Sequence, residues 1–227
     1  MSENLKYELK DDVAYLTLND GKANALSFEM IEALTAAFDK AAEEAQIVVL
    51  RGEGRALSAG FDLSVMGQGV EAAQKLVLAG GQLMLKIYEH PQPVIMASPG
   101  HALAAGGIML FCGDHRIGTL GSFRIGLNET AIGMVLPEFA YELARVCLET
   151  RYHTAAVVGA TLYDPAKAVE VGYLDEACAS EDVNAAIDAQ IAHYKTLNMK
   201  AYAGTKRKLR AAVATKIRDG FATDLGA

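Results

Sequence analysis

The stretch Gly100-His-Ala-Leu-Ala-Ala-Gly-Gly-Ile108 follows a short apolar run, Val94-Ile-Met-Ala97. Such a continuous apolar run is typical of a strand that is buried on both faces, as in a parallel sheet. The small residues after it predict a tight turn into a helix over residues 104–111, whose first N–H groups have no partner within the helix. Small side chains also permit tight helix packing, and this stretch alone does not decide between the two interpretations.

Strands and helices alternate on both sides of this stretch. Before it, the sequence predicts strands and helices with recognisable ends, including an amphipathic helix capped by Ser27 and a helix that stops before Pro91 and Pro93. Repeated strand–helix pairs favour an α/β core. The expected strands are 5–10, 13–18, 47–50, 94–97 and 116–119, and the expected helices are 28–42, 70–89 and 104–111.

From Pro137 onward the sequence predicts helices almost exclusively. Their ranges are 138–149, 151–159, 165–171, 183–196 and 201–218. No low-complexity linker separates the two halves. We therefore expect residues 1–136 to form the core and residues 137–227 to form a helical region that packs on the core and on neighbouring subunits.

Composition excludes several classes of protein. The chain has 227 residues, 52% of them hydrophobic, and a formal net charge of −7, which disfavours nucleic-acid binding. Neither an apolar signal core nor a run of membrane-spanning length is present, so we expect no membrane partner. The three cysteines and five histidines share no ligand spacing, which predicts no metal and reduced thiols in the cytoplasm.

One basic cluster runs against the acidic balance, in Gly204-Thr-Lys-Arg-Lys-Leu-Arg210. A short basic run on a helix is usually a solvated face. The alternative is a local contact for a phosphorylated ligand.

Two further motifs point to chemistry at an anionic oxygen. Ser58-Ala-Gly-Phe-Asp-Leu63 predicts a turn into a helix, with Asp62 as its N-cap, and exposed N–H groups there suit an anion. A plain strand-to-helix turn is the alternative. In Ile125-Gly-Leu-Asn-Glu-Thr-Ala-Ile-Gly133, Glu129 is a lone carboxylate among apolar residues. Apolar surroundings raise a carboxyl pKa toward the range of a general base, whereas a solvated loop glutamate is the alternative.

These motifs occur together with Asn24-Ala-Leu-Ser27 and Cys112-Gly-Asp114. In order and spacing they resemble the crotonase (enoyl-CoA hydratase/isomerase) superfamily over nearly the whole chain. The resemblance implies a spiral of ββα turns followed by a C-terminal helical trimerisation region. It also implies an acyl-CoA thioester as ligand, no cofactor beyond the coenzyme A of the substrate, and assembly as a homotrimer or a dimer of trimers.

The resemblance also assigns roles to single residues. It implies that the backbone N–H groups of Phe61 and Ala105 bind the thioester oxygen, and that Glu129 moves the proton. Residues implied to line the coenzyme A and acyl site are Lys22, Ala23, Ala25, Ala59, Gly60, Asp62, Leu63, Leu103, Gly106, Asn128 and Gly133.

The sequence departs from the superfamily in a trimmed loop near residues 65–70 and at two single positions that bear on the reaction. Hydratases of the superfamily use two glutamates, and the second falls at Ile108, which cannot move protons. Ala105 stands where glycine is usual. Because the segment around Glu129 is especially similar to the double-bond isomerases, we expect isomerisation of 3-enoyl-CoA to 2-enoyl-CoA with Glu129 as sole acid/base. The alternatives are a hydratase or another enolate-forming crotonase, and a non-catalytic acyl-CoA-binding or scaffold subunit.

Overall fold

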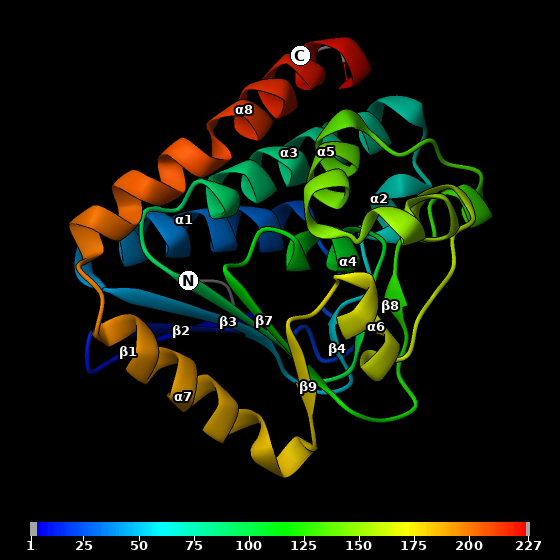
Figure 1. The fold of residues 1–227 in the computed structure, drawn as a ribbon. Coiled ribbons are helices and arrows are strands. Elements are labelled where there is room, and N and C mark those ends of the chain that lie inside the picture. Colours follow the sequence, from blue (N-terminus) through cyan, green and yellow to red (C-terminus); the bar gives the residue numbers. More distant parts are fainter. Residues whose placement is uncertain (1–3, 226–227) are drawn as a thin grey trace.

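The computed structural model describes residues 4–225, which form two sheets covered by helices (Figure 1). The larger sheet has six strands in the order β1-β2-β3-β5-β7-β9, and the smaller has three in the order β4-β6-β8. β1 and β2 are antiparallel, and the other pairings within the two sheets are parallel. The strands are β1 Leu5–Lys10, β2 Val13–Leu18, β3 Ile47–Gly52, β4 Ala56–Ser58, β5 Val94–Ser98, β6 His101–Leu103, β7 His115–Thr119, β8 Ile125–Gly126 and β9 Glu176–Cys178.

Longer helices alternate with short helical turns along the chain. The α-helices are α1 Phe28–Glu44, α2 Leu63–Met66, α3 Val70–Tyr88, α4 Ala105–Leu110, α5 Glu138–Cys147, α6 Pro165–Val171, α7 Val183–Lys195 and α8 Met199–Leu225. Short 3₁₀ turns lie at Thr130–Ile132, Thr150–Tyr152 and Ser180–Asp182, and a π-helical turn spans Thr154–Val158.

Successive strands alternate between the two sheets. β3, β5 and β7 enter the larger sheet, and each is followed by a strand of the smaller sheet, β4, β6 or β8. Helices α2 and α3 follow the first pair and α4 follows the second. The chain therefore winds as a spiral of ββα turns, which confirms the predicted fold class.

The larger sheet is covered on both faces, because the side chains of its strands alternate in direction. Val48 and Leu50 of β3 belong to the core shared with α1 and α3. Ile47 and Val49, one residue out of phase, belong to a second core that α7 closes. This period of two places α1 and α3 on one face and α7 on the other, as Figure 1 shows.

Most of the predicted elements are confirmed, but four short strands, β4, β6, β8 and β9, were not predicted. β4 and β6 have only three residues each and lie in segments that read as turns. β9 lies in the second half and pairs with β7, so the expectation of an all-helical second half is wrong at this point. The division between residues 136 and 137 stays a prediction.

Lys206 and Arg210 correct the prediction of a solvated basic face. Lys206 is 7% exposed, and its ammonium lies 2.5 Å from the carboxylate of Asp114. Arg210 lies 3.0 Å from the same carboxylate and donates to the Gly113 carbonyl at 3.0 Å. Burial lowers the pKa of Lys206 to about 8. Both cations fix α8 to the ends of α3 and α4. Arg207 and Lys208 of the same cluster are exposed, as the predicted solvated face requires.

Candidate active site

The predicted coenzyme A loop lies between β2 and α1, against the segment that follows β4. The Ala59 N–H donates to the Ala23 carbonyl at 2.9 Å, and the Leu26 N–H donates to the Gly60 carbonyl at 2.9 Å. The Asp62 N–H returns to the Leu26 carbonyl at 3.2 Å. The structure therefore brings the predicted residues of 22–25 and 59–62 side by side.

The N–H of Phe61 is left free by this pairing. The N–H groups of the residues before and after it both donate hydrogen bonds. Within residues 4–225, however, the Phe61 N–H donates none. A peptide unit is planar and trans, so its carbonyl and N–H point in opposite directions. The bond from Leu26 to the Gly60 carbonyl therefore fixes the direction of the Phe61 N–H.

The N–H of Ala105 is the second free donor, at the start of α4. Its peptide unit is fixed in the same way, because the Ala104 carbonyl accepts from the Ile108 N–H at 3.0 Å. Within the described part of the chain, the Ala105 N–H has no acceptor. A methyl group placed on Gly60 would lie 3.6 Å from the Ala105 nitrogen, so the two donor segments are in direct contact.

Close backbone approach depends on the glycines of this corner. A methyl group on Gly106 would lie 2.1 Å from the Ser58 carbonyl oxygen. One on Gly107 would lie 2.8 Å from the Gly126 carbonyl oxygen. α4 therefore begins in contact with both β4 and β8, which the predicted tight turn requires.

Glu129 follows β8, next to the start of α4. The Ala104 N–H donates to the Gly126 carbonyl at 3.1 Å and holds the Glu129 loop to this corner. The Glu129 side chain is 6% exposed, and its Oε2 is buried without a hydrogen-bond partner. Burial raises the pKa of Glu129, although backbone N–H groups of Glu129 and Asn128 partly oppose this effect. The predicted raised pKa is confirmed, and the solvated-loop alternative is wrong.

The remaining predicted residues surround this corner. Asp62 caps α2 by accepting from the Ser64 N–H at 2.8 Å, as expected, and Leu63 is 79% exposed. Leu103 ends β6 and pairs with Gly126 of β8. Asn128 has a buried Oδ1 without a partner. Gly133 ends the turn after Glu129 in the left-handed region, at φ 79°.

Three residues that shape the site were not predicted. Asp20 lies outside the predicted motifs, yet its carboxylate accepts from the N–H groups of Lys22, Asn24 and Ala25. Ala104 has φ 50° and ψ −124°, a backbone conformation that an alanine in the sequence does not predict. Gly80 of α3 makes room for Phe61, because a methyl group there would lie 2.3 Å from the ring. For Gly80, the pair Gly80-Gly81 inside a predicted helix was the available signal, and it indicated close packing without identifying the partner.

The position of the missing second carboxylate is closed to solvent. Ile108 is 1% exposed and belongs to the main hydrophobic core. Within residues 4–225, no group of three or more His, Cys, Asp or Glu side chains is placed to hold a metal ion. Among the described helices, none combines the length and the apolarity needed to cross a membrane.

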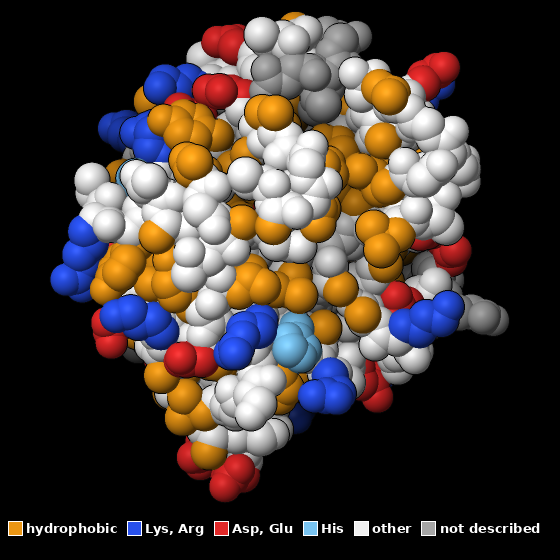
Figure 2. All heavy atoms as spheres, turned by 90° about the vertical axis from the view of Figure 1, so that its right-hand side faces the viewer, with side chains coloured by type: hydrophobic (Ala, Val, Ile, Leu, Met, Phe, Trp, Pro, Cys, Tyr) orange, Lys and Arg blue, Asp and Glu red, His pale blue; other side chains and the backbone are white. Residues whose placement is uncertain are grey.

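An apolar pocket of about 740 Å³ adjoins the Glu129 loop. Met134 lines this pocket and connects it to the Glu129 loop, because the Met134 N–H donates to the Glu129 carbonyl at 2.9 Å. Figure 2 faces the side on which α2 and β8 lie, and hydrophobic side chains gather over its middle. The pocket is lined by Met66, Val70, Ala73, Gln74, Val77, Met134, Val135, Leu136, Pro137 and Glu138.

The spiral of ββα turns places the chain among the crotonase-type proteins. The family model described as enoyl-CoA hydratase/isomerase matches residues 8–226. The chain therefore belongs to the enoyl-CoA hydratase/isomerase family. A crystal structure of a family protein from Pseudomonas syringae is 40% identical with a TM-score of 0.97, covering 99% of this chain and 98% of that one.

Two curated relatives carry different reaction names. A Bacillus subtilis protein named probable enoyl-CoA hydratase is 36% identical over 132 residues, which are 56% of this chain and 50% of that protein. The Mus musculus protein named enoyl-CoA delta isomerase 1, mitochondrial, is 26% identical over 210 residues, which are 90% of this chain and 73% of that protein. The match therefore spans only half of the Bacillus relative, and the two names leave the reaction open.

Proposed function

We propose that this protein isomerises 3-enoyl-CoA to 2-enoyl-CoA, with Glu129 as the sole acid/base. One observation carries the proposal: a buried carboxylate with an unpaired oxygen lies at the same corner as two free N–H groups. No second carboxylate occupies the Ile108 position, which is buried in the core. One carboxylate is enough to remove a proton and return it, whereas hydration needs a second group to position water.

The reaction follows from these groups. Glu129 removes a proton from C2 of the bound thioester, and the electron pair moves through the carbonyl to give a dienolate. The charge collects on the thioester oxygen, where the N–H groups of Phe61 and Ala105 stabilise it. Protonated Glu129 then returns the proton at C4, which leaves the double bond between C2 and C3. The proton is conserved, and no cofactor is needed beyond the coenzyme A of the substrate.

The acyl chain and the nucleotide occupy opposite sides of this corner. The apolar pocket beside Met134 suits an aliphatic acyl tail. The loop at residues 22–25 and the segment at 59–63 receive the coenzyme A part. We expect the helical region to assemble three copies, or two sets of three, in the cytoplasm.

The test supplies purified protein with a short 3-enoyl-CoA and follows formation of the conjugated thioester by ultraviolet absorbance. Glu129→Gln keeps the shape of the side chain but cannot accept the proton, so kcat falls by about 10³–10⁴-fold while acyl-CoA binding persists. Calorimetric titration with a saturated acyl-CoA checks the binding. Conjugation at an undiminished rate in the variant would remove Glu129 from the mechanism. No conjugation by the wild type, with acyl-CoA still bound, would retire the isomerase and leave a silent binder or another enolate chemistry.

Hydration is the second candidate, favoured by the name of the Bacillus relative. Its test is the loss of conjugated absorbance when a 2-enoyl-CoA is supplied in water. A steady hydration rate that exceeds the isomerisation rate would replace the first proposal by the second.

A further inference from the structure

The carboxylate of Asp20 gathers the backbone of the coenzyme A loop. One oxygen accepts from the N–H groups of Lys22 and Asn24, at 2.8 Å each. The other oxygen accepts from the N–H of Ala25 at 2.9 Å. Burial alone would raise the pKa of Asp20, but these three hydrogen bonds hold it below its ordinary value. Asp20 is therefore ionised at neutral pH and binds the loop through charge-assisted hydrogen bonds.

Asn24 ties the same loop to the strand that precedes the oxyanion corner. Its side chain is 1% exposed and donates to the carbonyls of Glu53 and Ala56, at 3.2 and 2.8 Å. Its Oδ1 accepts from the Asp20 N–H at 3.1 Å. Asn24 has φ 55°, a left-handed conformation that the bonds to Asp20 maintain. The Asp20 carboxylate and the Asn24 side chain therefore hold this loop from both of its ends.

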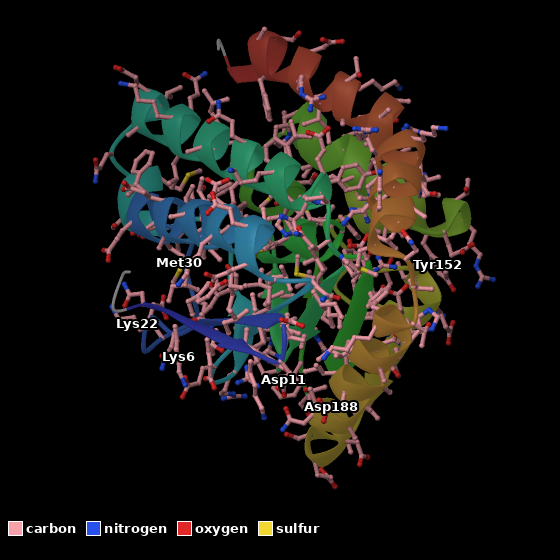
Figure 3. All side chains as sticks on the ribbon, turned by 90° about the vertical axis from the view of Figure 1, so that its left-hand side faces the viewer. Lys6, Asp11, Lys22, Met30, Tyr152 and Asp188 are labelled. Carbon is pink, nitrogen blue, oxygen red and sulfur yellow. The ribbon has the colours of Figure 1, made fainter. Side chains whose placement is uncertain are left out.

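This anchored loop ends at the residue that orients the first oxyanion donor. Leu26 follows Ala25 directly, and its N–H donates to the Gly60 carbonyl at 2.9 Å. That carbonyl belongs to the same planar peptide unit as the Phe61 N–H. Figure 3 shows Lys22 on this loop, at the end of the sheet near Met30 in the first turn of α1 and away from the turn at Asp11.

We propose that Asp20 is a positioning residue for catalysis, which sets the direction of the Phe61 N–H through the loop at residues 22–26. The proposal rests on the proposed function, because the Phe61 N–H matters only where an oxyanion forms. In this proposal Asp20 acts on the backbone of the loop and does not contact the substrate. Its effect reaches the reaction through Ala25, Leu26 and the Gly60 carbonyl, in that order.

The competing possibility is that Asp20 shapes only the groove for the nucleotide. The two possibilities differ in which part of the substrate they affect. A donor that is misplaced by about 1 Å slows the chemical step by roughly a hundredfold, whatever the remote part of the substrate. A distorted nucleotide groove weakens binding of coenzyme A but leaves a thioester without the nucleotide unaffected.

The test compares a 3-enoyl-CoA with the matching 3-enoyl thioester of N-acetylcysteamine, which lacks the nucleotide. For Asp20→Ala we expect kcat with the coenzyme A substrate, and kcat/KM with the truncated one, to fall by about 10–100-fold. Asp20→Asn keeps one acceptor oxygen and gives an intermediate loss. If the truncated substrate reacts at the wild-type rate, or if only KM for the coenzyme A substrate rises, the proposal is overturned.

A matched control and a readout independent of turnover complete the design. Asp164 caps α6 by accepting from the Lys167 N–H at 2.9 Å, and Asp164→Ala should leave both rates unchanged. In two-dimensional NMR, Asp20→Ala and Asp20→Asn should shift the Phe61 amide signal, while the Asp164 variant leaves it in place. An unshifted Phe61 amide in both Asp20 variants would refute the positioning role even if the protein turned over no enoyl thioester. A shifted amide without wild-type turnover would instead show that only the proposed function fails.

Discussion

Two buried carboxylates of this protein have opposite surroundings. The Asp114 carboxylate accepts a hydrogen bond from the Val94 N–H at 2.8 Å and lies beside Lys206 and Arg210. Its negative charge is therefore compensated by the two cations. Glu129 lies among apolar residues with Oε2 unpaired. Burial of a charge is costly unless it is paired, so the fold compensates the Asp114 carboxylate but leaves the Glu129 carboxylate uncompensated. The difference shows that two carboxylates of similar burial can differ in whether their charge is compensated, and the uncompensated one belongs to the residue proposed as the base.

The largest expected effect comes from breaking the compensated cluster. Asp114→Asn leaves the buried Lys206 and the half-buried Arg210 without their counterion and should destabilise the fold by about 3–5 kcal/mol, as measured by urea unfolding. The matched control is Glu142→Gln. Glu142 is also buried, but its partners Arg145 and Lys216 are largely exposed and regain water, so its loss should be clearly smaller. Equal losses in the two variants would contradict the role given to the Asp114 cluster.

The Glu129→Gln substitution should change the free energy of unfolding in the opposite direction and by a smaller amount, so that the fold becomes more stable. Because burial raises the pKa of Glu129, the folded state holds its proton more tightly than the unfolded state does. The ionised side chain therefore destabilises the fold as pH rises above the unfolded value near 4.5. The variant should gain roughly 1 kcal/mol at pH 7 and almost nothing at pH 4.

Urea unfolding at both pH values checks this prediction. A gain of the same size at pH 4 and pH 7 would show that ionisation of Glu129 is not its cause. A loss of stability at pH 7 would show that the carboxylate has a partner and would remove the contrast with Asp114.

The smallest expected effect concerns the strained backbone at the start of α4. Ala104 has φ 50°, which costs an alanine energy and costs glycine almost none. Ala104→Gly should therefore stabilise the fold by about 0.5–1 kcal/mol, a rise in Tm of about 1–4 °C in thermal unfolding. A fall in Tm would mean that the packing of the methyl group outweighs the strain.

The sequence predicted what periodicity and chemistry encode locally. Apolar neighbours of Glu129 implied its burial, and the alternation of buried strands with helices implied the α/β core. The hydrogen bonds of Asp20 could not be predicted from the sequence, because an Asp-Gly pair predicts a turn in any protein. β9 could not be predicted for another reason. Its three half-buried residues form a strand only because they pair with the edge of β7. Lys206 and Arg210 were misassigned because their counterion lies far away in the sequence, at Asp114.

The position of β9 also determines when the sheet can be completed during synthesis. β7 ends at Thr119, yet its neighbour begins at Glu176, and Arg116 reaches across to Asp175 with bonds of 2.8 Å. A chain that has left the ribosome only as far as α6 exposes an unpaired edge of a hydrophobic parallel sheet, which readily pairs with other chains. We therefore expect truncated forms that lack residues 176–178 to aggregate more readily than the full chain.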